Sequence, residues 1–203
     1  MKIAIASLAL PKAGALALTV AADGTFGPFG ADLDARTGGI LSRAIAAGRF
    51  TGKPDETLTV LVPTGVEVGR IVLVGIGKPA EATAATASGA AAAVVAGLLT
   101  SGETELAIAA DTFDGLGVEP ATFAAEMAFG AVARGWRFDR YKTKTPEEKK
   151  PTLKKVTILT DAKGAKKAWD KLEKVADGVF LTREVVAEPP NVLYPETFAE
   201  RCA

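Results

Sequence analysis

The chain has 203 residues, with 24 basic and 24 acidic side chains, no histidine and one cysteine. Without histidine, it cannot form a Ser-His-Asp or Cys-His catalytic set. The same counts exclude an internal disulfide and a zinc site built from histidine or several cysteines. Any metal would need carboxylate, lysine or carbonyl ligands. The length allows one full domain with a remainder, or one large domain.

Alanine and the basic residues are distributed unevenly. Alanine accounts for 39 residues, close to a fifth of the chain. Because alanine favours helix and lets helices approach closely, we expect densely packed helices. The segment 134–155 carries nine basic and three acidic side chains, although the whole chain is neutral.

The first 22 residues admit two interpretations. Lys2 followed by an apolar stretch is typical of a secretory signal, but Pro11-Lys12 places a charge inside that stretch. Apolar residues also alternate over 3–5 and 16–20, which predicts two strands joined by a turn at 11–14. We expect the strands.

Further elements follow in chain order. Helical spacing predicts an amphipathic helix over 33–47. The continuous apolar runs 57–62 and 70–76 predict strands buried on both faces. Pro79 is placed to start a long helix that reaches Leu99. The remaining predictions are a strand at 105–110, a helix at 120–134, an exposed loop at 141–151, a strand at 155–160, a long helix at 163–187 with a broad apolar stripe, and a helix at 195–203.

This alternation predicts an α/β fold, with a mixed sheet covered by helices on both faces. The long helix ends at Glu188-Pro189-Pro190-Asn191, because a residue before proline avoids the helical region. We interpret it as a connector that leads into a second unit beginning near Asn191. The final predicted helix reaches the last residue, which suggests a truncated second domain. The alanine-rich run 84–99 is too short and too polar to span a membrane.

Two kinds of candidate site are weak. Gly75-Ile76-Gly77-Lys78 lies between a strand and a helix, where phosphates often bind. It matches neither the dinucleotide pattern nor the nucleotide P-loop, so a simple turn is favoured. The pairs Asp32/Asp34 and Asp111/Asp114 resemble turn or cap residues more than metal ligands, since a hard cation needs several oxygens. Cys202 supports no argument about reactivity.

The basic segment 134–155 is a candidate nucleic-acid contact. It interleaves bases with Trp136, Phe138 and Tyr141, and such segments bind nucleic acid through phosphate contacts and stacking. The neutral charge of the whole chain favours the alternative, a helix end and solvated loop whose aromatic side chains pack inward. The lysines that would contact DNA are Lys149, Lys150, Lys154 and Lys155.

Two long segments resemble the cytosolic leucyl aminopeptidase family, close to its bacterial members. The first joins Glu126–Gly130 to Trp136-Arg137-Phe138-Asp139-Arg140-Tyr141-Lys142-Thr143-Lys144, and the second is Arg183–Ala199. Weaker glycine-containing segments at 38–41, 50–53 and 71–78 follow the family's order. One departure is Ala187, where the family commonly has asparagine.

The resemblance implies a division of the chain and an activity for the parent protein. Residues 1–162 would form a macrodomain-like N-terminal domain, 163–190 a connector helix, and 191–203 the start of a catalytic domain. Family enzymes are cytoplasmic hexamers that release N-terminal residues from peptides and prefer leucine-like side chains. They use two divalent metals, manganese or zinc, held by Asp, Glu and Lys beyond the position of Ala203. The resemblance therefore assigns no catalytic or metal-binding residue to this chain.

The role of the chain itself stays open at this point. Inactive alone, it would serve assembly or regulation of the aminopeptidase. The alternatives are a module that binds ADP-ribose-type nucleotides, which rests on fold analogy alone, and a DNA-binding module that uses the four lysines.

Overall fold

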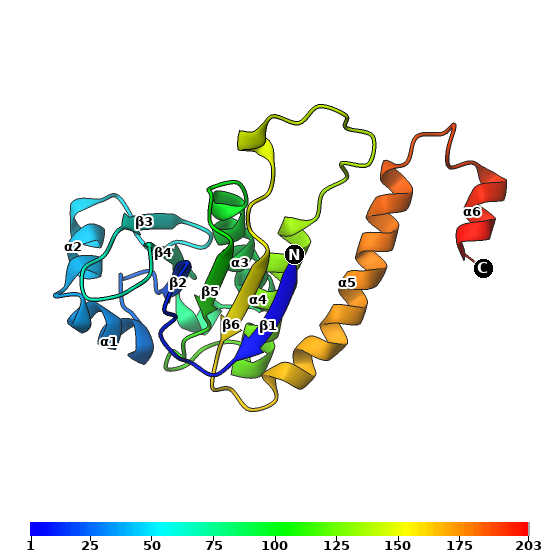
Figure 1. The fold of residues 1–203 in the computed structure, drawn as a ribbon. Coiled ribbons are helices and arrows are strands. Elements are labelled where there is room, and N and C mark those ends of the chain that lie inside the picture. The colour runs from blue at the N-terminus through cyan, green and yellow to red at the C-terminus, as the bar shows by residue number, and fades with distance from the viewer. Residues whose placement is uncertain (203) are drawn as a thin grey trace.

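The computed structural model describes residues 1–202 and has a three-layer α/β architecture (Figure 1). Six strands form one sheet in the order β1-β6-β5-β2-β4-β3. Neighbouring strands are parallel, except that β3 is antiparallel to β4. The strands are β1 (Lys2–Ala6), β2 (Ala15–Val20), β3 (Thr57–Leu61), β4 (Arg70–Gly75), β5 (Glu105–Ala109) and β6 (Lys155–Leu159).

The helices lie on both faces of the sheet, which confirms the predicted fold class. They are α1 (Pro28–Arg36), α2 (Ile40–Ala47), α3 (Ala84–Leu98), α4 (Pro120–Gly135), α5 (Ala165–Ala187) and α6 (Pro195–Cys202), with short 3₁₀ turns η1 (Pro79–Glu81) and η2 (Glu147–Lys149). Across residues 1–202, none of the helices is both long and apolar enough to cross a membrane. Ala203, the last residue of the predicted 195–203 helix, lies outside the described residues.

The central strand β2 separates two hydrophobic cores. Leu16, Leu18 and Val20 face α1 and α2 and pack with Leu33 and Leu41. Alternate residues of the strand face α3, α4 and α5, where Ala15 and Ala17 join the second core. Since side chains of a strand alternate between faces, one apolar strand serves both layers. Every residue of β2 is buried.

Helices α3 and α4 pack unusually closely, as the alanine content predicted. Their buried positions are mostly alanine. At Gly130 in α4, an added Cβ would lie only 2.0 Å from the carbonyl oxygen of Ser88 in α3. A helix pair at this separation has no room for a methyl group at the crossing point.

The N-terminal strands are confirmed, but they are not neighbours. β1 pairs with β6 at one edge of the sheet, and β2 lies in the centre. β6 and β5 therefore separate two strands that follow each other in sequence. Strand order depends on which apolar faces pack together, and the local turn at 11–14 carries no information about it.

The predicted single helix at 33–47 is wrong, because two helices meet there. Gly38 and Gly39 adopt φ values of 68° and 73°, a left-handed conformation that ends α1. The Asp34 side chain then caps α2, accepting hydrogen bonds from the backbone of Leu41 at 2.9 Å and of Ser42 at 3.1 Å. Apolar residues keep helical spacing across Gly38-Gly39, so the sequence pattern does not reveal the break between α1 and α2.

Two other predicted elements need correction. Pro79 starts only the short η1 turn, and the long helix starts later, because Thr83 and Thr86 form a reciprocal capping box. The run 57–62 is an edge strand and is not buried on both faces: the Leu61 side chain is 63% exposed. The other runs predicted as strands are confirmed.

The long helix α5 confirms the prediction for 163–187, but only part of its apolar stripe is covered. Trp169 and Ala176 are buried against the domain. Val175 and Val186 of the stripe are 53% and 79% exposed, and Leu181, on another side of the helix, is 54% exposed. In Figure 1, α5 stands at the side of the sheet domain, and α6 lies beyond it. An apolar surface therefore remains open on the connector.

Candidate functional site

The glycine segment at 75–78 is a structural turn. Its backbone amides are already bonded within the chain: Gly75 to Glu56 O at 2.9 Å, Ile76 to Val20 O at 3.0 Å and Gly77 to Gly52 O at 2.9 Å. A phosphate at this turn would therefore find none of these three donors available. Glycine at position 75 instead lets two backbone segments approach closely, since a Cβ there would lie 2.0 Å from the Lys53 carbonyl oxygen.

The acidic pairs also have structural roles. Asp34 caps α2, and Asp32 forms an ion pair with Arg36 at 2.7 Å. The buried Asp111 accepts hydrogen bonds from the amides of Gly30 and Thr112, both at 2.9 Å. Burial raises the pKa of Asp111 above its ordinary value, although these hydrogen bonds act in the opposite direction.

The two metals implied by the resemblance do not fit the residues that the structure describes. Within residues 1–202, no three or more Asp, Glu, Cys or His side chains are grouped so as to hold a metal ion. Asp114, the remaining member of the predicted pairs, is exposed at the mouth of a pocket. We therefore derive no chemical step through a metal from this chain.

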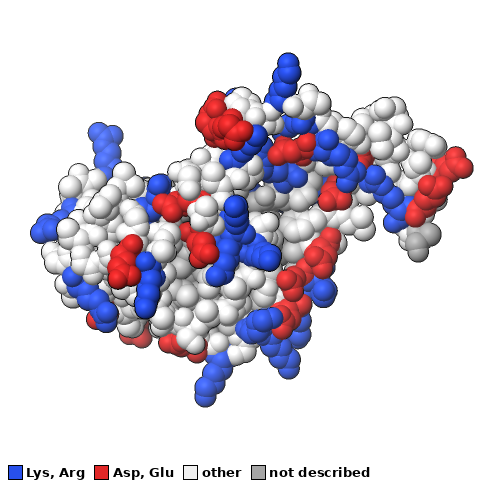
Figure 2. Space-filling view, in the orientation of Figure 1, with Lys and Arg blue, Asp and Glu red and all other residues white. Residues whose placement is uncertain are grey.

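The four lysines predicted to contact DNA lie around the η2 turn and the start of β6. All four are exposed. Lys150 forms an ion pair with Glu147, and the Lys155 ammonium lies 4.0 Å from the Glu105 carboxylate. On the face shown in Figure 2, basic and acidic side chains are interspersed. Nucleic-acid contact through Lys149, Lys150, Lys154 and Lys155 stays a prediction.

The aromatic residues of the same segment form a row, with one stacked and one tilted pair, beside α5. Ring centroids are 6.4 Å apart for Trp136 and Phe138, and 5.7 Å apart for Phe138 and Tyr141. The Arg183 guanidinium of α5 lies 5.6 Å from the Trp136 centroid. It also donates a hydrogen bond to the Ala133 carbonyl at 2.8 Å. These contacts attach the segment after α4 to the connector helix.

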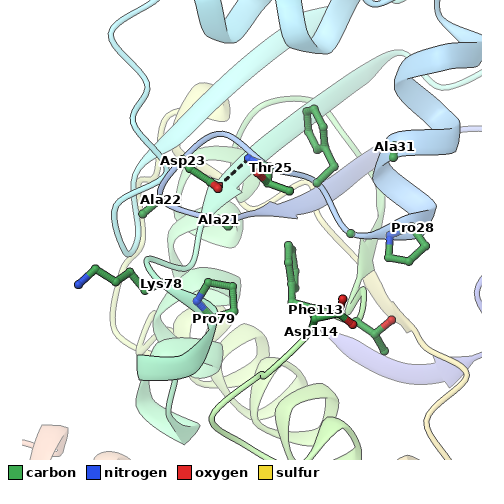
Figure 3. Close-up of a pocket in the computed structure, with 13 residues that line it drawn as sticks. Ala21, Ala22, Asp23, Thr25, Pro28, Ala31, Lys78, Pro79, Phe113 and Asp114 are labelled. Atoms are coloured by element: carbon green, nitrogen blue, oxygen red, sulfur yellow. Dashed lines mark hydrogen bonds between the residues drawn. The ribbon is translucent and has the colours of Figure 1, made fainter.

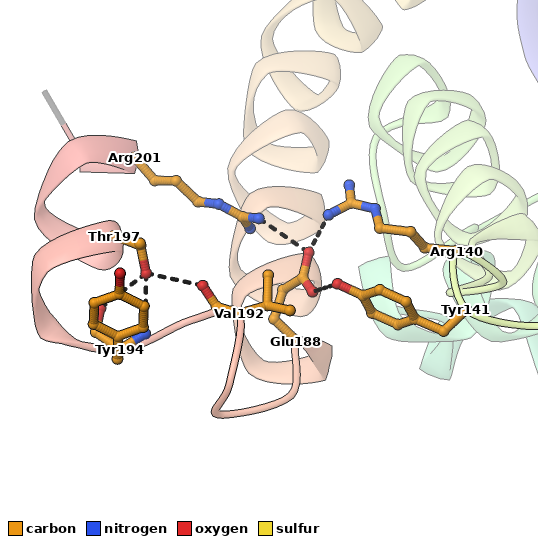
Figure 4. Close-up of polar contacts among 7 residues, drawn as sticks. All are labelled: Arg140, Tyr141, Glu188, Val192, Tyr194, Thr197 and Arg201. Atoms are coloured by element: carbon orange, nitrogen blue, oxygen red, sulfur yellow. Dashed lines mark hydrogen bonds and ion pairs between the residues drawn. The ribbon is translucent and has the colours of Figure 1, made fainter.

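The row leads to a polar cluster that we call the Glu188 anchor, made of Arg140, Tyr141, Glu188 and Arg201 (Figure 4). The Glu188 side chain, directly after α5, has no solvent-accessible surface. Its carboxylate accepts hydrogen bonds from the Tyr141 hydroxyl and from the Arg140 guanidinium. It also accepts one from Arg201 of α6 at 3.0 Å. One carboxylate thus joins three segments of the chain.

Electrostatics favour the ionised form of Glu188. The Tyr141 hydrogen bond, and then the Arg201 hydrogen bond and the charges of Arg140 and Arg201, lower the Glu188 pKa below its ordinary value, although desolvation opposes them. The Glu188 hydrogen bond in turn raises the pKa of Tyr141. A buried charge with this many partners fixes the geometry of the groups around it.

The turn between α5 and α6 is ordered by its own hydrogen bonds. The Pro189 carbonyl accepts from the amides of Val192 at 2.9 Å and Leu193 at 3.0 Å. The Thr197 hydroxyl donates to Val192 O at 3.0 Å and accepts from the Tyr194 amide at 3.0 Å (Figure 4). The segment after the connector therefore leaves the domain in a defined direction.

Sequence reasoning treated Glu188 only as the end of a helix. Its partners Arg140 and Tyr141 are 48 and 47 residues away in sequence, so no local pattern connects them. The sequence offered one clue to this role: Glu188 is a charged residue before two prolines, in a segment that resembles the family.

The comparisons with known proteins agree with the fold. A family model described as "Cytosol aminopeptidase family, N-terminal domain" matches residues 17–145. The chain belongs to the cytosol aminopeptidase family. The match includes the first of the two long segments, Glu126–Lys144, and the matched residues carry the family's N-terminal domain.

Curated relatives in the family are longer than this chain. A probable cytosol aminopeptidase of Caulobacter vibrioides is 42% identical over 166 residues, covering 81% of this chain and 32% of the relative. Another from Afipia carboxidovorans is 35% identical over 216 residues, covering 100% of this chain and 40% of the relative. The chain thus spans about a third of the length of the curated relatives it matches.

Solved structures extend the family likeness to the fold. A mutant of tomato leucine aminopeptidase has a TM-score of 0.82 and 27% identity, covering 98% of this chain and 41% of that one. The bottromycin maturation enzyme BotP has a TM-score of 0.70 and 27% identity, covering 93% of this chain and 36% of its own. The macrodomain-like description of the domain stays a prediction.

Proposed function

We propose that this chain is the non-catalytic N-terminal part of a cytoplasmic two-metal aminopeptidase. The parent would release N-terminal residues from peptides, with manganese or zinc held by carboxylates and lysine of a C-terminal catalytic domain. The proposal includes the boundaries 1–162, 163–190 and 191–203. The family match, and the third of the relatives' length that the chain spans, support it.

The role of this part would be to direct the connector and present it for assembly. The observation that carries this is the Glu188 anchor, which joins the end of α5 to the 136–142 segment and to α6. The exposed Val175 and Val186, which lie on one side of α5 because they are eleven residues apart, add an apolar surface of the kind that subunit or domain contacts bury. A hexamer with the catalytic domains packed on such surfaces is part of this proposal.

Activity measurements test the proposal directly. The purified chain and the full-length parent are each incubated with a leucyl chromogenic substrate and manganese. We expect turnover by the parent and none by the chain, because the residues described here hold no metal group. Robust turnover by the chain alone would show that the catalytic machinery has been placed wrongly. An inactive parent would contradict the assigned activity.

A further inference from the structure

A pocket of about 680 Å³ opens at the carboxyl ends of β2, β4 and β5. We call it the switch-point pocket, formed mainly by the segments 21–28, 78–79 and 112–114. After β2 the chain turns to α1 on one face of the sheet, and after β5 it turns to α4 on the other. Ligands of open α/β sheets bind where successive connections diverge in this way.

Two aromatic side chains line the pocket from opposite layers. Phe26 packs against the core beneath α1 and α2, whereas Phe113 packs against the core beneath α3 and α4. Both are only half-buried. In Figure 3 the Phe113 ring projects toward the turn that carries Asp23 and Thr25. The pocket therefore offers aromatic surface from both layers to a flat apolar group.

The frame of the pocket is held by backbone hydrogen bonds. Ala21 N donates to Thr25 O and Ala22 N donates to Gly77 O, both at 2.9 Å. Asp23 accepts a hydrogen bond from the Thr25 amide at 3.0 Å. A ligand would thus enter a largely preformed space and would not need to order these loops.

Charge at the pocket favours a cation. Asp23 and Asp114 are exposed at its mouth. Lys78, the basic residue of the lining, forms an ion pair with Glu81 at 2.8 Å. In Figure 3 its side chain extends away from the other lining residues. The two carboxylates are therefore the charges most available to a ligand.

Several amides near the pocket are not available to an anion. The N-terminus of α1 borders the pocket, but the Gly30 amide already donates to Asp111, and Pro28 has no N–H. The amides of Gly75, Ile76 and Gly77 bond to backbone carbonyls. A phosphate or carboxylate would therefore meet two acidic side chains and none of these amides as a donor.

We propose that the switch-point pocket binds a small organic cation with a flat aromatic part, of the arylalkylamine class. The ring would lie between Phe26 and Phe113, and the ammonium group would sit beside Asp23 and Asp114, which hold it by charge. The site does not depend on the proposed aminopeptidase activity, because it uses only residues of the sheet domain.

Three indole probes of similar size and different charge test the proposal. Tryptamine is a cation, tryptophol is neutral and indole-3-propionate is an anion at neutral pH. Each is titrated into the full chain, and binding is followed by amide NMR shifts of Thr25 and Thr112. We expect tryptamine to bind about fivefold more tightly than tryptophol, the size of a partly exposed charge contact. Indole-3-propionate should be the weakest.

Substitutions test separately how the two carboxylates and the aromatic side chains contribute to binding. The double variant Asp23→Asn/Asp114→Asn should bind tryptamine and tryptophol equally. Phe113→Leu, which keeps an apolar side chain, should weaken both probes by a similar factor. Asp170→Asn/Asp177→Asn on α5 is the matched control for loss of two exposed charges, and should leave all three affinities unchanged. Circular dichroism confirms folding of each variant.

Several outcomes would overturn the proposal. Equal affinity for the three probes would remove the charge argument, and tighter binding of the anion would reverse it. Amide NMR shifts in α5 or in the 142–150 loop, without shifts at Thr25 and Thr112, would show that the probes bind at another site. None of these outcomes would affect the assay of the parent's activity.

Discussion

One residue, Glu188, holds the end of the connector helix α5 against the neighbouring segments of the chain. Its fully buried carboxylate has partners from the segment after α4 and from α6, and Figure 4 shows these groups converging on it. Removing the charge takes away the ionised acceptor that two guanidinium groups and a hydroxyl share. These partners are partly exposed, so water can solvate them, and the loss should loosen the anchor without a large cost to the domain.

We expect Glu188→Gln to loosen the anchor without unfolding the sheet. Amide hydrogen exchange should become faster in 136–142 and 189–202, while protection of β2 and β4 stays unchanged. Glu173→Gln, an exposed glutamate on the same helix, is the matched control. Unchanged exchange in both segments would mean that the packing of Trp136 on Arg183 alone holds the connector.

The effect of Glu188→Gln on the anchor should depend on pH. The contacts of the anchor lower the Glu188 pKa below its usual value of 4.5, so the ionised carboxylate stabilises the anchor above that pH. This contribution is lost as pH falls through the lower, folded-state pKa. The difference in exchange protection of 136–142 and 189–202 between the native chain and Glu188→Gln should therefore be full at pH 6 to 7 and shrink below about pH 4.5. A difference that grows with acidity would contradict the assigned charge state.

At the scale of elements, the close approach of α3 and α4 sets the spacing of these two helices within one layer. Alanine lines the contact, and Gly130 lies where the backbones come closest. The sequence predicted close packing from composition, but not the position of the crossing. Which alanines meet depends on the register of two helices that are joined through β5, so only the folded chain determines it.

Matched glycine substitutions should separate packing from helix propensity. Gly130→Ala places a methyl group 2.0 Å from the Ser88 carbonyl oxygen and should destabilise the fold by about 1–3 kcal/mol. Gly97→Ala in α3 meets nothing within 4 Å and should stabilise by about 0.5–1 kcal/mol. Urea unfolding measures both. A stabilising Gly130→Ala would show that the helices can separate at little cost.

At the scale of the whole molecule, α5 packs against the sheet domain over only part of its apolar surface. Trp169 and Ala176 are buried, whereas Val175 and Val186 form an exposed apolar face on one side of the helix. The chain covers 41% of the tomato leucine aminopeptidase chain that it resembles. The assembly role proposed above depends on this apolar face.

Polar substitution of this face should affect only the full-length parent. Val175→Gln/Val186→Gln should change the unfolding free energy of this chain by no more than about 0.5 kcal/mol, because both side chains are exposed. In the full-length parent, the same pair should weaken assembly, as measured by light scattering. Lys171→Gln, exposed on the same helix, is the control. Intact assembly of the doubly substituted parent would exclude this face as a contact.

The sequence by itself determined the elements that depend on local patterns and composition. Strand alternation, continuous apolar runs and the two prolines after Glu188 predicted the α/β class and the connector helix, because these signals act between near neighbours. Local signals also caused the errors: helical spacing hid the break at Gly38-Gly39, and apolar content made the edge strand β3 look central.

Only the tertiary structure decided what lies together. It separated β1 from β2 by two strands, joined Glu188 to Arg140 across 48 residues, and assembled the switch-point pocket from loops after three strands. The physical reason is the same in each case. Burial of apolar faces chooses which distant segments meet, and the polar contacts then form between groups that no local pattern in the sequence relates.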